Sequence, residues 1–174
     1  MAKNTKKYIL TGVILGSIAA VSAGLIALTN LITSKKIEEN KNNRILAGIS
    51  EIFGENSVIK NDKELTKYEY TVRYYEITNK KNIFLGYAFK CEGSNMYGKI
   101  ALLAGFDATS HSFMSVSLIT NEQTYASTLE DNYIVSLNNE EKGRDDVNCG
   151  ATYGAKLVRD MIKDAGKAAK DLWK

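Results

Sequence analysis

Cysteine, histidine and proline are scarce or missing in this sequence, and each shortage narrows the chemistry open to it. The 174 residues include two cysteines, one histidine and no proline. Two cysteines are too few for a disulfide scaffold, and positions 91 and 149 match no zinc-site spacing. A single disulfide between Cys91 and Cys149 stays open if the domain faces an oxidising compartment. The lack of proline, beside many Asn and Lys residues, indicates a compositional bias and no function.

The lone histidine offers no catalytic arrangement. His111 lies in a Ser-His-Ser turn, and no nucleophile, base and orienting acid can be assembled around it. We therefore expect a surface position for His111 and no catalytic residue in the chain. Asp145 and Asp146 could form a metal pair, but no metal site is predicted because Asp146 has a better explanation below.

Excess positive charge is also missing from most of the chain. Lys3, Lys6 and Lys7 account for the whole formal net charge of +3, so the remainder carries 20 basic and 20 acidic residues. A neutral remainder lacks the basic surface that nucleic acid requires, and nucleic-acid binding is excluded.

A long uncharged segment is present near the start. Residues 8–34 contain no charged side chain and are rich in Ile, Leu and Val. A bilayer core is crossed by roughly 20 apolar residues, so this segment predicts a transmembrane helix. The alternative is a cleaved signal peptide, with Val21-Ser22-Ala23 as the small-residue site. Because the apolar run continues to Ile32, past the length of a signal core, we favour the uncleaved anchor. Lysines flank both ends, so the positive-inside rule does not choose a side.

The rest of the chain predicts an α+β domain. Residues 35–53 have helical spacing and stop at Gly54. Residues 55–64 are polar, and we expect them to form the connection between this helix and the strands that follow. Period-two patterning then predicts strands near residues 68–74, 83–89, 97–106 and 113–120, with short turns that favour an antiparallel sheet. Residues 155–173 form an amphipathic helix that we expect to pack on the sheet. Tyr68, Tyr70, Tyr74 and Tyr75 are assigned to sheet packing rather than to stacking on a ligand.

One threonine stands just before this last helix. Gly150 and Ala151 leave the Thr152 hydroxyl accessible, and a helix that starts there points free N–H groups and its positive dipole end toward a bound phosphate. Lys156 could add a cation. A glycine followed by threonine is also a common helix cap, and from the segment alone the cap interpretation is favoured.

A family resemblance reverses that preference. The segment Asp146-Val147-Asn148-Cys149-Gly150-Ala151-Thr152 resembles the flavinylation motif of the FMN-binding domain family, which is an Asp, three residues ending in Ser or Thr, and Gly-Ala-Thr. The family includes the G subunit of the Rnf electron-transport complex and the C subunit of sodium-translocating NADH:quinone reductase. Residues 27–40 and 97–107 resemble further family segments, so the similarity extends along nearly the whole chain.

The resemblance implies a cofactor and its residues. FMN would be joined to Thr152 through a phosphoester bond by a dedicated flavin transferase, beside Cys149, Gly150 and Ala151, and Asp146 would be the motif acid that the transferase reads. Two positions depart from the family pattern. Cys149 stands where Ser or Thr is usual, and Gln123 replaces an acidic residue of a Glu-Thr-Pro-Gly turn.

The predicted organisation is a cytoplasmic N-terminus and anchor at 1–34, a juxtamembrane helix at 35–54, and an FMN-binding domain at 55–174 on the extracytoplasmic side. The resemblance implies an electron-carrier subunit of an ion-translocating ferredoxin:NAD oxidoreductase complex, with other membrane subunits as partners, rather than an enzyme acting alone. The alternatives are a stand-alone extracellular electron-transfer flavoprotein, or a non-redox anchored binding protein that kept the fold and lost the flavin.

Overall fold

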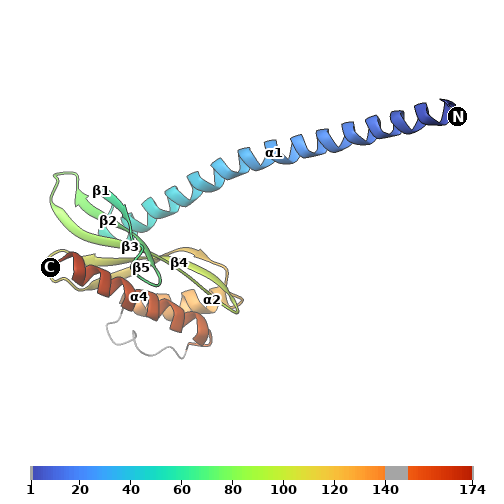
Figure 1. The fold of residues 1–174 in the computed structure, drawn as a ribbon. Coiled ribbons are helices and arrows are strands. Elements are labelled where there is room, and N and C mark those ends of the chain that lie inside the picture. Colours follow the sequence, from blue (N-terminus) through green and yellow to red (C-terminus); the bar gives the residue numbers. More distant parts are fainter. Residues whose placement is uncertain (1, 140–148, 174) are drawn as a thin grey trace. The chain divides into compact units, whose positions relative to one another are not determined.

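The chain forms a long helix, a five-stranded sheet and a group of C-terminal helices (Figure 1). The computed structural model describes residues 2–139 and 149–173. They fall into two compact units, residues 1–43 and 44–174. The elements are α1 (Ala2–Phe53), β1 (Ser57–Glu64), β2 (Thr71–Asn79), β3 (Phe84–Asn95), β4 (Gly98–Asp107), β5 (Phe113–Asn121), α2 (Ala126–Thr128), the π-helix η1 (Leu129–Ile134), α3 (Val135–Asn139) and α4 (Thr152–Leu172).

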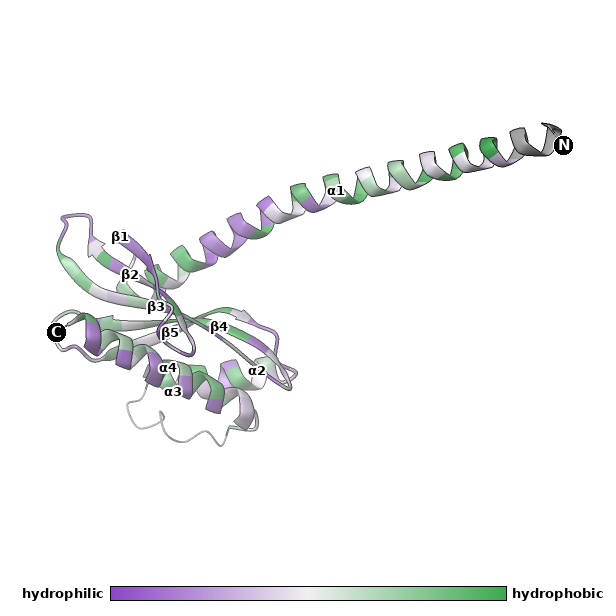
Figure 2. Cartoon of the chain, in the orientation of Figure 1, coloured by the Kyte–Doolittle hydropathy of each residue, from purple (hydrophilic) through white to green (hydrophobic). Residues whose placement is uncertain are grey.

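The first unit consists of α1 alone, up to residue 43. Its apolar side chains are exposed to the surroundings, and the helix is long and apolar enough to cross a membrane (Figure 2). The hydroxyls of Ser17, Thr29 and Ser34 donate to carbonyl oxygens four residues earlier, so these polar groups are satisfied within the helix. The predicted helices at 8–34 and 35–53 are confirmed as one uninterrupted helix that ends before Gly54.

The sheet confirms the predicted α+β class. Its five strands are antiparallel and follow one another in the order β1-β2-β3-β4-β5. The four predicted strands appear as β2 to β5 with shifted ends. The interpretation of residues 55–64 as a connection is wrong, because Ser57–Glu64 forms the edge strand β1. Its side chains are mostly exposed and it lacks apolar alternation. Pairing with β2 is supported instead by polar cross-strand contacts such as Arg73 to Asp62 at 2.7 Å.

One face of the sheet is covered by the last turns of α1. Ile45, Ile49 and Ile52 are buried there in a cluster with β-strand residues, among them Ile77 and Leu103. Glycines allow the close approach: a Cβ on Gly105 would lie 2.3 Å from Ile52 Cγ2. This part of α1 therefore belongs to the compact domain, which begins at Arg44. The predicted division into an anchor, a juxtamembrane helix and an FMN-binding domain stays a prediction.

The opposite face is covered by α4. Its buried stripe packs on β3 and β4 through Leu157, Val158, Met161 and Ala165, as the amphipathic pattern predicts. The helix is fixed at one point by a buried carboxylate. Asp164 Oδ2, 6% exposed as a residue, accepts hydrogen bonds from the N–H groups of Tyr70 and Thr71 and from Thr71 Oγ1, at 2.9 to 3.0 Å. These contacts join the middle of α4 to the start of β2.

Removal of this carboxylate should destabilise the domain. We expect Asp164→Ala to lower the free energy of unfolding by about 3 kcal/mol, because two backbone N–H groups and one hydroxyl lose a charged acceptor. Urea unfolding of the full chain in an uncharged detergent measures the change. Asp160→Ala, which removes a half-exposed ion pair with Arg159, should cost no more than about 0.5 kcal/mol. Equal losses in the two variants would contradict the proposed anchoring.

The two cysteines are free thiols in different surroundings. Cys91 is fully buried, and burial raises the pKa of its thiol to about 12. Cys149 is half-buried. The disulfide left open above is therefore absent from the structure.

We expect one fast-reacting thiol in the folded chain, because an aromatic disulfide reagent reacts with an accessible thiolate. Denaturation should release a second. Cys149→Ser should abolish the fast reaction, whereas Cys91→Ser should leave it unchanged. Two fast thiols, or none without a reductant, would argue against this assignment.

Candidate functional site

Thr152 is the first residue of α4, and its hydroxyl is available for chemistry. The N-cap of the helix is Ala151, and no side chain caps the N-terminus. The cap interpretation of Thr152 is therefore wrong. Gly150 has φ +83°, a left-handed conformation that turns the chain into the helix. Among the described residues, Thr152 Oγ1 has no hydrogen-bond partner, and its side chain is half-buried.

The first turn of α4 has backbone N–H groups that make no intrahelical hydrogen bond. The first intrahelical bond runs from Ala155 N–H to Ala151 carbonyl at 3.0 Å, so the N–H groups of residues 152–154 precede the helical ladder. No acidic residue lies in this turn. Lys156 Nζ lies 5.9 Å from the centre of the Tyr153 ring. A phosphate on Thr152 would meet the helix N-terminus.

A pocket of about 240 Å³ adjoins Thr152. Its aromatic lining residues are three tyrosines. Tyr97 is the last residue before β4, Tyr125 directly precedes α2, and Tyr153 follows the threonine. The remaining lining residues are Gln123, Leu129, Gly150, Ala151, Thr152 and Gly154. Tyr125 and Tyr153 are more than half exposed. The volume is smaller than the roughly 300–1,000 Å³ of enclosing ligand pockets, so a flavin-sized ring would be held at its edge or on one face and not engulfed.

The pocket wall is held by a hydrogen-bond network that spans three segments. Asn95 connects them: its Nδ2 donates to Tyr153 carbonyl at 3.2 Å, and its Oδ1 accepts from Tyr97 N–H at 2.8 Å and from Gln123 Nε2 at 3.1 Å. Gln123 Nε2 also donates to Gly98 carbonyl at 2.6 Å. The β3–β4 turn, the chain after β5 and the start of α4 are thereby fixed to one another.

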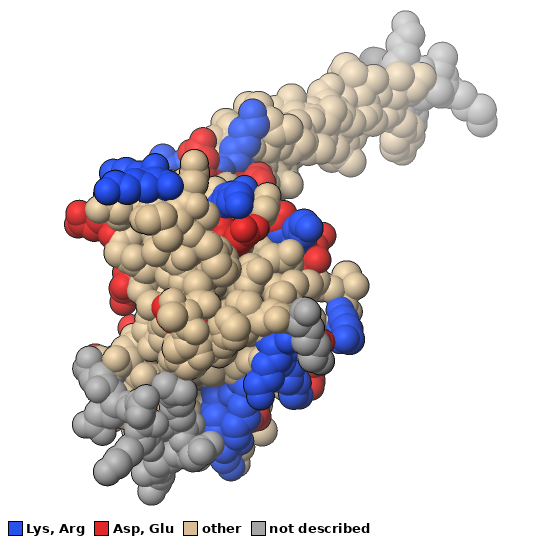
Figure 3. All heavy atoms as spheres, turned by 90° about the vertical axis from the view of Figure 1, so that its left-hand side faces the viewer, with Lys and Arg blue, Asp and Glu red and all other residues tan. Residues whose placement is uncertain are grey.

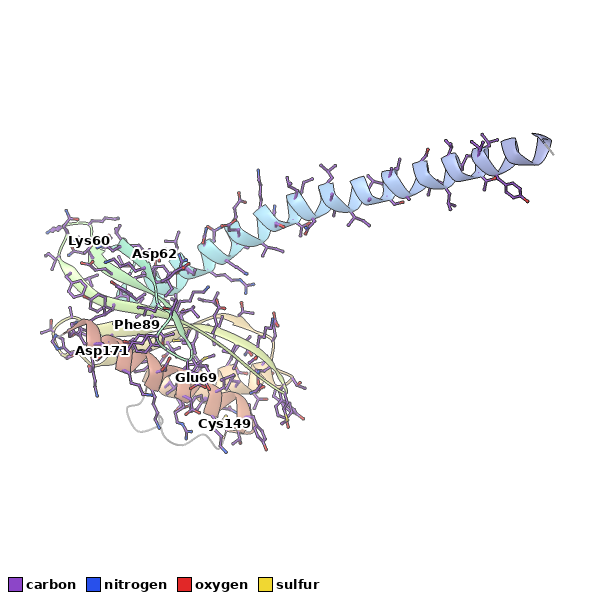
Figure 4. The ribbon with its side chains drawn as sticks, viewed as in Figure 1. Lys60, Asp62, Glu69, Phe89, Cys149 and Asp171 are labelled. Atoms are coloured by element: carbon purple, nitrogen blue, oxygen red, sulfur yellow. The ribbon has the colours of Figure 1, made fainter. Side chains whose placement is uncertain are left out.

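The motif residues before Thr152 are only partly described. Cys149 lies beside the first turn of α4 (Figure 4), and its carbonyl accepts from Asn132 Nδ2 at 3.1 Å. A Cβ on Gly150 would lie 3.2 Å from Thr128 Cγ2, so the loop is packed against α2. Asp146, the predicted motif acid, and Asp145 lie outside the described residues.

The other residues considered from the sequence do not gather at this site. His111 stacks on Trp173 with ring centres 4.3 Å apart, near the far end of α4. Tyr75 is buried in the core, and Tyr68, Tyr70 and Tyr74 are partly buried against the cluster under α4, which favours the packing interpretation. Within residues 8–139 and 149–173, no group of three or more candidate metal ligands occurs.

Sequence reasoning did not identify Asn95, Tyr97, Tyr125 or Tyr153 as site residues. Asn95 and Tyr97 come from the β3–β4 turn and Tyr125 from the chain after β5, so no spacing in the sequence relates these three to Thr152. Tyr153 follows Thr152 directly, but the motif gives that position no role. From the sequence, Gln123 is only a departure from the family pattern. Its two side-chain hydrogen bonds explain why an amide stands at this position. Both of its Nε2 partners are oxygen acceptors, which an amide can serve and an ionised carboxylate cannot.

The class of protein follows from these observations: an α+β domain attached to an apolar helix that could span a membrane once. A protein-family model described as the RnfG N-terminal region matches residues 1–52. The chain is therefore similar to the RnfG subunit along α1 as far as its penultimate residue, and this similarity supports an Rnf-type subunit. No curated protein matches the chain at a significant level.

The amide at position 123 should be required for stability at neutral pH. In Gln123→Glu, the buried carboxyl would face two oxygen acceptors, which raises its folded-state pKa above the usual value of about 4.3. A raised folded pKa gives stability that is present below the unfolded pKa and is lost as pH rises through the folded pKa. We therefore expect a small loss at pH 4 and a loss of about 2 kcal/mol at pH 8 in urea unfolding.

Thr124→Glu is the matched control, because it adds the same charge at the next, exposed position. Its unfolding free energy should stay within about 0.5 kcal/mol of the parent at both pH values. A pH-independent effect of Gln123→Glu would contradict the assigned hydrogen bonds.

Proposed function

We propose that this protein is a membrane-anchored electron-transfer flavoprotein that carries FMN covalently on Thr152. The observation that carries the proposal is the Thr152 hydroxyl, which is unpartnered among the described residues and stands at the N-terminus of α4 beside a tyrosine-lined pocket. The motif resemblance supports the same residue. The chemistry supplied by a bound flavin is one- and two-electron transfer.

The residues around Thr152 fit a flavin phosphate and ring. The N–H groups of residues 152–154 would hold the phosphoryl oxygens, and Lys156, one turn further along α4, would add positive charge. Tyr97 and Tyr153, with ring centres 5.4 Å apart, would offer aromatic surface to the ring system. Gln123, fixed by Asn95 and Gly98, would keep this wall neutral.

Attachment requires an exchange at phosphorus. Thr152 Oγ1 would form a bond to the FMN phosphorus of FAD while the bond to the AMP phosphate breaks, and AMP would leave as the threonine proton is lost. Among the described residues, nothing beside Thr152 supplies a base for that proton. A separate flavin transferase would therefore act on the exposed turn, with Asp146 as a recognition residue.

The apolar helix would fix the location of the proposed carrier in the cell. A single apolar helix would hold the domain at the membrane, where other subunits of an Rnf-type complex would exchange electrons with it. We propose the extracytoplasmic side for the domain, where a covalent bond would prevent loss of the cofactor. The predicted organisation into anchor, juxtamembrane helix and FMN-binding domain is part of this proposal.

Coexpression with a flavin transferase tests the attachment. The full chain should give a flavin-fluorescent band that survives denaturing electrophoresis, because a phosphoester is not broken by detergent. Thr152→Val should remove the fluorescence completely. Thr124→Val, a nearby exposed threonine outside the motif, should retain it.

A fluorescent Thr152→Val variant, or a parent chain that stays dark, would rule out flavinylation at this residue. The dark result would favour the non-redox anchored binding protein. Given a fluorescent chain, copurification of other membrane subunits would support a complex subunit, and their absence would favour a stand-alone carrier.

A further inference from the structure

Gln123 is a buried amide in the wall of the Thr152 pocket, and only one end of its side chain is paired. The residue is 7% exposed and lies just after β5. Its Nε2 donates to Asn95 Oδ1 at 3.1 Å and to the Gly98 carbonyl at 2.6 Å. Its Oε1 accepts no hydrogen bond from any residue that the structure describes. The amide is therefore satisfied as a donor and open as an acceptor.

Backbone groups fix the direction of this amide. Asn95 Oδ1 accepts from the Tyr97 N–H at 2.8 Å, and Asn95 Nδ2 donates to the Tyr153 carbonyl at 3.2 Å. A reversed Asn95 would place donor against donor and acceptor against acceptor. Asn95 Oδ1 and the Gly98 carbonyl are both acceptors, so they require the Nε2 end of Gln123. Oε1 is thereby directed away from both acceptors.

Oε1 borders the open space of the pocket. Gln123 is a lining residue, and a Cβ built on Gly154, another lining residue, would lie 3.3 Å from Oε1. Among the described side chains, Trp173 Nε1 is the one fully buried polar atom without a hydrogen-bond partner. Since Oε1 also lacks a partner, it keeps some exposed surface, and that surface faces the pocket beside the first turn of α4.

The pocket calls for a neutral donor at this point. Its described lining residues include no charged side chain, although basic and acidic side chains both reach the surface on the face shown in Figure 3. An unpaired acceptor in a buried residue is unfavourable until an O–H or N–H group reaches it. A phosphoryl oxygen offers no proton, so it suits the N–H groups of residues 152–154 and not Oε1.

We propose that Gln123 Oε1 accepts a hydrogen bond from the flavin that Thr152 carries, which makes Gln123 a cofactor-binding residue. This contact rests on the proposed attachment at Thr152. A flavin has two kinds of neutral donor, the hydroxyls of its ribityl chain and the N–H of its ring, and either would meet the open acceptor. Since Asn95 and Gly98 already hold the amide, the acceptor needs no rearrangement when the cofactor is attached.

Unfolding of the full chain with and without flavin tests this contact. Chain coexpressed with a flavin transferase is the loaded form, and chain expressed in cells without one is the flavin-free form. Urea unfolds both in an uncharged detergent. Gln123→Met keeps the length of the side chain, removes the amide and should destabilise both forms, because the Nε2 hydrogen bonds exist in both. Attachment of flavin should also stabilise the parent more than Gln123→Met, by about threefold to tenfold in the unfolding equilibrium constant.

Asn138→Leu is the matched control. Asn138 is an amide outside the pocket, and each end of its side chain makes a hydrogen bond to the Val116 backbone, at 2.8 and 2.9 Å. Its replacement should cost the loaded and flavin-free forms the same factor, because no flavin contact is lost. An amide that is only structural would give this result at position 123 as well.

A second measurement needs no variant at position 123. Gln123 is the only glutamine of the chain, so glutamine labelled with carbon-13 at its side-chain carbonyl gives one labelled side-chain band in the infrared spectrum. Attachment of flavin should move and narrow this band, because one fixed donor replaces exchanging water. The band should stay unchanged when Thr152→Val is coexpressed with the transferase. This measurement decides the question if Gln123→Met does not fold.

Vibrational spectra of the loaded chains in H2O and D2O identify the donor. A deuterium shift of the flavin ring bands that differs between the parent and Gln123→Met assigns the contact to the ring N–H. An equal shift, together with the extra stabilisation of the loaded parent, assigns the contact to a ribityl hydroxyl.

Extra stabilisation of the loaded parent, together with a moved glutamine band, supports the contact. Two results overturn it while covalent flavin on Thr152 stands: loaded and flavin-free forms of Gln123→Met that lose the same factor, or a glutamine band that attachment leaves unchanged. A parent chain without covalent flavin would instead overturn the proposed function and this contact with it, so the two failures are distinguishable.

Discussion

The contact between α4 and the sheet determines the position of Thr152 and of the residues around it. Asp164 joins the middle of the helix to the first residues of β2, and an apolar stripe holds the rest of the helix on β3 and β4. With the helix fixed in this way, its N-terminus has one position. Thr152 therefore stands against the β3–β4 turn and the chain after β5, although nothing near it in sequence predicts those neighbours.

The same helix separates two surfaces of different character. Its first turn offers free N–H groups, one accessible hydroxyl and a wall of tyrosines, with no acid in the turn. Its later turns present a row of cations above an apolar hollow. The first surface suits the phosphate and the aromatic ring of the proposed covalent FMN.

Periodicity revealed the long elements but not the contacts between distant turns. The apolar run and the amphipathic pattern predict α1 and α4, because burial or a bilayer dictates those residues directly. β1 escaped prediction because it is a polar edge strand, stabilised by pairing and by contacts such as Arg73 to Asp62. Thr152 was found through a local motif. No local motif could predict the hydrogen bond between Asn95 and Gln123, because only the fold brings these two residues together.

Thr152 is the residue proposed to carry the cofactor, and mass spectrometry of the protein matured with its flavin transferase gives the sharpest test of this assignment. The intact chain should gain the mass of one FMN less one water. Fragmentation of the proteolytic peptide that contains Gly150-Ala151-Thr152 should locate this addition on the threonine. An unmodified Thr152 peptide in a chain that carries the added mass elsewhere, or a chain with no added mass, would contradict it.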